Sequence, residues 1–167
     1  METFGRKVAT AMIKREKEIQ ELVQARDEWK QICFLVYVTS NQAAYFCNKI
    51  EMCVDLIKTD SLDIEECRKE AFKDLNNLNE NLMKYFCIVN DSTFLDREVK
   101  DKLNNYYFHV CNLCFSYHSD FQNHCGLLLL GCESYFNLTQ KLDDNILNNT
   151  MLLIKRNLKE INAKLKG

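Results

Sequence analysis

The residues best suited to chemistry gather in one stretch of the chain, from position 109 to position 125. This stretch holds all three histidines and a Cys-x-x-Cys pair, and its possible metal ligands are His109, Cys111, Cys114, His118, His124 and Cys125. Zinc accepts imidazole nitrogens and thiolates of this kind. The types of residue present therefore raise a zinc site as a hypothesis, and their spacing decides how good it is.

The spacing along a helix argues against a complete zinc site. On one straight helix Cys111, Cys114, His118 and Cys125 project within about 60° of arc. However, Cys111 and His118 lie roughly 10 Å apart along the axis, whereas two ligands of one tetrahedral zinc ion are about 3.5 Å apart. A turn near residues 119–126 could bring His124 or Cys125 back towards the others. A zinc-stabilised domain with ligands among Cys111, Cys114, His118, His124 and Cys125 thus stays an alternative, and we expect mostly core or interface roles for these residues.

Other catalytic signatures are absent from the sequence. There is no glycine-rich phosphate loop, no Gly-x-Ser-x-Gly elbow and no His-Glu-x-x-His pair. A carboxylate-bridged di-metal bundle needs Glu three residues before its histidines, and those positions are Tyr106, Phe115 and Phe121. We therefore expect no catalytic residues, no cofactor and no enzymatic activity.

The element that must organise the fold is a run from about Val8 to Ile57 with apolar residues every three and then four positions. Eleven of the fourteen residues on this heptad line are apolar; the line is Met12, Arg15, Ile19, Leu22, Arg26, Trp29, Cys33, Val36, Ser40, Ala43, Cys47, Ile50, Val54 and Ile57. The pattern predicts one helix roughly 75 Å long. Residues 32–38 (ICFLVYV) could alone form a buried strand, but the heptad phase through them favours helix.

The two parts of this helix differ in their surroundings. From Lys14 to Lys30 the apolar line is narrow and flanked by charge, which is typical of a solvated coiled-coil arm. From Ile32 to Ile57 apolar residues occur on nearly every side, which indicates a helix surrounded by others. We expect a single domain over 1–167, with a coiled-coil arm at 1–31 and a helical bundle at 32–167.

Cap signals divide the rest of the chain into further helices. A turn at 58–63 precedes a predicted helix from about Leu62 to Val89, and a cap cluster at 90–93 precedes a third helix. Heptad phase from Leu103 to Leu142 favours one continuous helix over 94–142, with a kink or turn at 119–126 as the alternative. A capped turn at 142–145 precedes a closing stripe from Leu147 to Leu165. The prediction is an all-α, elongated antiparallel bundle of four, possibly five, long helices with an N-terminal coiled-coil arm.

Composition narrows the classes of partner and compartment. The net charge is −2, so the chain as a whole has no electrostatic footprint for nucleic acid or anionic lipid. Nine cysteines, an odd number, fall mostly on apolar stripes, where reduced thiols act as small hydrophobes. No signal peptide is recognisable, and the longest apolar run is too short to span a bilayer. We expect a cytoplasmic or nuclear protein with no membrane span.

These observations favour a non-enzymatic structural or adaptor subunit. It would assemble through coiled-coil and bundle contacts, as a homo-oligomer or with another helical protein, using the partner-binding residues Ile19, Leu22, Arg26, Trp29 and Ile32. The alternatives are a helical module for an apolar ligand or lipid, held by aromatic residues between Tyr106 and Leu142, and the zinc-stabilised interaction domain. A viral helical-bundle regulator of cell death is disfavoured, because Trp29 is followed by Lys30 and not by the Gly-Arg typical of that group. The sequence leaves partner identity, stoichiometry and pairing direction open.

Overall fold

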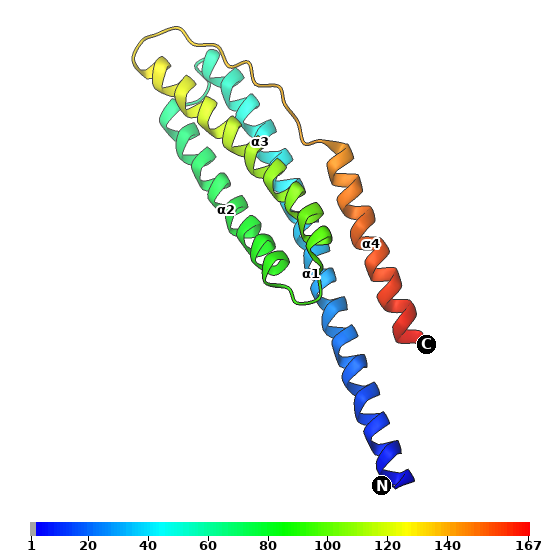
Figure 1. Ribbon diagram of the computed structural model, residues 1–167. Helices are drawn as coiled ribbons and strands as arrows, with labels where there is room; N and C mark the ends of the chain where they lie inside the picture. The colour runs from blue at the N-terminus through cyan, green and yellow to red at the C-terminus, as the bar shows by residue number, and fades with distance from the viewer. Residues whose placement is uncertain (1–2) are drawn as a thin grey trace.

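The computed structural model describes residues 3–167, and within them the chain is all-helical. Four helices follow one another: α1 (Phe4–Lys58), α2 (Ile64–Asp91), α3 (Arg97–Leu129) and α4 (Asp144–Lys166). Figure 1 shows α1, α2 and α3 running up, down and up as an antiparallel bundle, and α4 returning downwards beside the middle part of α1. The all-α prediction is confirmed, with four helices in the described residues. Met1 and Glu2, which belong to the predicted arm, lie outside the described residues.

The stretch ICFLVYV lies inside α1, so the choice of helix over strand is confirmed. Its residues face two environments, because Ile32 and Val36 are fully buried while Phe34 and Tyr37 are each 65% exposed. The expectation that this half of α1 is covered on every side is wrong. The helices α2, α3 and α4 all pack against α1, but they leave one of its faces in solvent.

The cap signals predict the starts of α2 and α4, whereas α3 begins later than predicted, because its N-cap is Asp96 and not the cluster at 90–93. Asp96 accepts a hydrogen bond from the Val99 N–H (2.8 Å), and Asp143 accepts one from the Asn145 N–H (2.9 Å). The helix α2 starts after Asp63, with Glu65 and Glu66 in its first turn, where carboxylates stabilise the positive end of a helix.

The predicted continuous helix over 94–142 is wrong, because α3 ends at Leu129. Gly131 adopts a φ of 78°, which costs a side-chain-bearing residue more than glycine. Its N–H donates to the Leu128 carbonyl (3.0 Å), and the Cys132 N–H donates to the Leu127 carbonyl (2.9 Å). These two bonds form a Schellman cap that stops the helix, not at 119–126 but a few residues later. The following connector, residues 130–143, runs over the bundle without helical structure.

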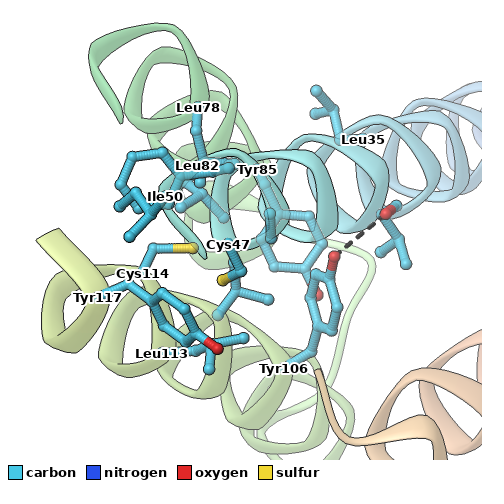
Figure 2. Packing of buried hydrophobic residues seen from close by; sticks show 14 of the residues in the cluster. Leu35, Cys47, Ile50, Leu78, Leu82, Tyr85, Tyr106, Leu113, Cys114 and Tyr117 are labelled. Atoms are coloured by element: carbon cyan, nitrogen blue, oxygen red, sulfur yellow. Dashed lines mark hydrogen bonds between the residues drawn. The ribbon is translucent and has the colours of Figure 1, made fainter. Parts of the chain in front are cut away.

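The core lies between α1, α2 and α3 and is filled by large side chains (Figure 2). The rings of Tyr85 and Tyr106 meet edge to face, with centroids 5.6 Å apart. Tyr85 Oη donates to the Leu103 carbonyl (2.7 Å), and Tyr106 Oη lies 2.8 Å from Thr39 Oγ1. Each buried hydroxyl therefore has a partner, and burial raises the pKa of Tyr106 to about 12. Within residues 3–167, no helix is both long enough and apolar enough to cross a membrane.

The burial pattern along α1 gives a direct stability prediction. Ile50 is 1% exposed whereas Met52, two residues away, is 61% exposed. Replacing Ile50 by Ala should lower the free energy of unfolding by about 2–5 kcal/mol, because the deletion leaves a cavity. Replacing Met52 by Ala should change it by about 0.5 kcal/mol or less. Urea unfolding followed by circular dichroism measures both, and equal losses would contradict the packing described here.

Candidate interaction surface

The zinc candidates on α3 face different neighbours. Cys114 lies in the core beside Cys47 of α1, as Figure 2 shows, and the two thiols are close enough to hydrogen bond. His118 packs against the ring of Phe72 on α2, with centroids 6.2 Å apart. Cys125 is fully buried. Residues 3–167 contain no group of three His, Cys, Asp or Glu side chains that could hold a metal ion. The structure therefore does not bring the predicted zinc ligands together.

His109 and His124, the other two histidines, form hydrogen bonds between α3 and the connector. His124 is 3% exposed, and its Nδ1 lies 2.9 Å from Ser134 Oγ. His109 Nε2 accepts a hydrogen bond from the Asp143 backbone N–H at 2.9 Å, directly before α4. These bonds give both residues a structural role, because they fix the path of the chain between α3 and α4.

The buried thiols are held in their protonated form. Burial raises the pKa of Cys125 to about 11, and burial together with neighbouring Cys53 raises that of Cys67 to about 11. The hydrogen bond with Cys47, together with burial, raises the pKa of Cys114 as well. Thiolates, and not thiols, are the nucleophiles and metal ligands, so these cysteines behave as core side chains.

The five predicted partner-binding residues divide into two groups. Ile19 is 44% exposed, and Leu22 and Arg26 are partly buried. Trp29 and Ile32 are only 4% and 0% exposed, because they pack into the chain's own core. In this fold Trp29 and Ile32 have little surface to offer a partner, and the accessible part of the heptad line lies before them.

The first part of α1 projects beyond the bundle, as Figure 1 shows in dark blue. Every residue from Thr3 to Glu21 is exposed, including five large apolar side chains: Phe4 (83%), Val8 (41%), Met12 (67%), Ile13 (68%) and Ile19 (44%). We call residues 4–21 the projecting segment. It is shorter than the expected arm at 1–31, because the side chains of α1 become covered from Leu22 onwards.

A second surface feature is an apolar groove of about 570 Å³ between α1 and α2. Phe34, Leu35 and Ile88 contribute to its apolar lining, and Lys30 and Lys84 also line it. By contrast, the region predicted to hold an apolar ligand is filled, since Tyr106, Tyr117 and Phe121 are fully buried in the core. The groove is the feature of the described residues that best suits an apolar ligand.

Sequence reasoning missed both the connector contacts and the groove. Ser134, Phe136 and Leu138 are partly buried and alternate with exposed Tyr135 and Asn137, a period of two that is typical of extended chain. The sequence does not show this alternation, because Ser134 is polar and Tyr135 is aromatic. The groove had no sequence signal either. Its two walls come from α1 and α2, and only their register places Lys30 near Lys84.

Buried His124 and partly buried His118 predict a pH dependence of stability. Burial lowers the pKa of His118 and of His124, and nearby Lys58 lowers that of His124 further. The neutral forms therefore favour the fold, and their contribution is fully present above the unfolded pKa of about 6.5. As the pH falls below this value towards the folded pKa, the unfolded chain takes up protons first and stability is lost.

We expect the melting temperature to drop between about pH 7.5 and pH 5.5, and the drop to shrink in a His118→Asn/His124→Asn variant. Differential scanning fluorimetry at both pH values measures this. An equal drop in the wild type and the variant would show that other groups cause it.

No protein-family model, curated protein or solved structure matches this chain, so its function is argued from the geometry above.

Proposed function

We propose that this chain is a non-enzymatic structural or adaptor subunit that assembles through the projecting segment. The observation that carries this proposal is that every residue from 4 to 21 is exposed, although Val8, Met12 and Ile19 repeat at the spacing of a helix contact line. A line of this kind is normally buried against another helix. We propose a cytoplasmic or nuclear setting, in keeping with nine free thiols.

The projecting segment continues a line that is already buried further along α1. Met12, Ile19 and Leu22 precede Trp29 and Val36 in heptad phase, so all five share one side of the helix. Trp29 and Val36 are buried within the chain, where α2, α3 and α4 pack on α1. In Figure 1, α4 ends part-way along α1, short of its N-terminus. A helix from another chain could therefore extend the same packing along the exposed part.

Covering this line would favour association. Fully burying a side chain such as Met or Ile stabilises by about 1.5–3 kcal/mol relative to exposure. Most helical stability in proteins comes from tertiary packing, which the projecting segment lacks within its own chain, so contact with a second helix also suppresses fraying of the segment. The proposed partner is another helical protein chain, and a second copy is the simplest case.

An alternative function, binding of an apolar ligand or lipid, is supported by the groove between α1 and α2. Its apolar lining, together with Lys30 and Lys84, suits an amphiphile with an acidic head group. Dodecanoate binding, followed by calorimetry, should weaken about tenfold or more when Lys30 and Lys84 are both replaced by Glu. Unchanged binding, or none by the wild type, would count against this alternative.

The assembly proposal predicts a concentration-dependent mass for the full-length chain. Sedimentation velocity between about 1 and 200 µM should detect species heavier than the monomer. Replacing Met12 and Ile19 together by Glu should weaken association by at least about 100-fold, which corresponds to about 2.7 kcal/mol, because two apolar contacts are lost.

Phe115→Glu provides the matched control, because Phe115 is 69% exposed but lies on α3. This variant should assemble as the wild type does, and all variants should keep the helical circular dichroism of the bundle. A wild type that stays monomeric over the whole range, or equal weakening by Phe115→Glu, would contradict the proposal.

A further inference from the structure

Charge is distributed unevenly along the beginning of α1. Residues 3–15 include four basic side chains and no acidic one: Arg6, Lys7, Lys14 and Arg15. Residues 16–28 include five acidic side chains and two basic ones; the acidic residues are Glu16, Glu18, Glu21, Asp27 and Glu28. All charged side chains from Arg6 to Glu21 are exposed, so the projecting segment presents to solvent the four basic residues of its first part and three of the acidic ones, Glu16, Glu18 and Glu21.

We infer that the projecting segments of two copies of this chain pair with each other in antiparallel orientation. The inference rests on the proposed function and deepens it by naming the partner and the direction. Antiparallel pairing places the basic half of one segment beside the acidic half of the other, twice in one symmetric interface. Parallel pairing would place basic beside basic and acidic beside acidic.

The heptad line of the segment favours the same direction. With a two-fold axis between Ile13 and Lys14, Val8 faces Ile19 of the second copy, and Met12 faces Arg15 of the second copy. The aliphatic part of Arg15 can then cover Met12, while its guanidinium reaches solvent. In a parallel pair Arg15 would face Arg15 of the second copy in the same layer, which brings like charges together in the contact line.

The N-terminus of α1 supplies a further reason for acidic side chains to lie beside it. The first turn of α1 contains no acidic residue, whereas α2, α3 and α4 each have at least one. Arg6 and Lys7 thus stand near the positive end of the helix dipole, which is unfavourable. In the antiparallel register described above, Glu18 and Glu21 of the second copy come level with this end and offset its charge.

Three charge variants of the full-length chain test the inference. The acidic variant carries Arg6→Glu, Lys7→Glu, Lys14→Glu and Arg15→Glu; the basic variant carries Glu16→Lys, Glu18→Lys and Glu21→Lys; the swapped variant carries all seven changes. All seven positions are exposed, so the bundle should keep its fold, and circular dichroism checks this. Sedimentation velocity at about 20 and 500 mM salt, a range over which screening becomes strong, measures their association.

Antiparallel pairing predicts that the acidic and basic variants each self-associate about tenfold or more weakly than the wild type at low salt, and that mixing them restores association. The swapped variant should self-associate as the wild type does, since its halves remain complementary. It should not, however, form mixed dimers with a wild-type chain that carries a C-terminal fluorophore.

Two other outcomes would overturn the inference, and they are distinguishable. The wild type could assemble and yet form mixed dimers freely with the swapped variant, or all charge variants could self-associate as strongly as the wild type. Either result overturns the antiparallel pairing and leaves the assembly function standing. A wild type that stays monomeric up to about 200 µM overturns both.

Discussion

The structure depends on a mismatch in helix length. The helix α1 has 55 residues, whereas α2, α3 and α4 have 28, 33 and 23. At about 1.5 Å per residue, α1 exceeds its longest neighbour by roughly 30 Å. A bundle in which the neighbours pack along one part of α1 therefore leaves the other part without cover. The exposed Phe4, Met12 and Ile19 follow from this constraint and not from an unusual local sequence.

Much of the fold could be predicted because its signals are local. Heptad phase through residues 32–38 overrides the strand tendency of ICFLVYV. Ile32 and Val36 are buried as the helical spacing requires, whereas Phe34, which would share their face in a strand, is exposed. The cap at Asp143 marks the start of α4 through a side-chain oxygen close to the helix N-terminus, whereas the cap cluster at 90–93 places the start of α3 a few residues before its N-cap, Asp96. Such signals require no knowledge of neighbouring helices.

The sequence predictions were wrong where contacts between distant parts of the chain determine the structure. The heptad phase continues past Leu129 because Leu138 and Leu142 of the connector fall on the same line and also pack against the core, but from extended backbone. The spacing of apolar residues alone does not separate a helix from an extended connector. It places Gly131 within the predicted helix, whereas Gly131 is part of the cap that ends α3. Likewise, Trp29 and Ile19 lie on one heptad line, and only the position of the other helices buries Trp29 while leaving Ile19 exposed. The accessible part of the candidate surface therefore could not be read from the sequence.

The central claim is that the projecting segment is covered by a second chain, and hydrogen exchange of its backbone amides tests this most directly. An uncovered helix end opens readily, whereas a helix packed against a partner exchanges slowly. The account predicts that the amides of residues 4–21 exchange about tenfold or more slowly at 200 µM than at 1 µM, while those of the bundle core do not change. Exchange of residues 4–21 at the same rate at both concentrations would contradict it.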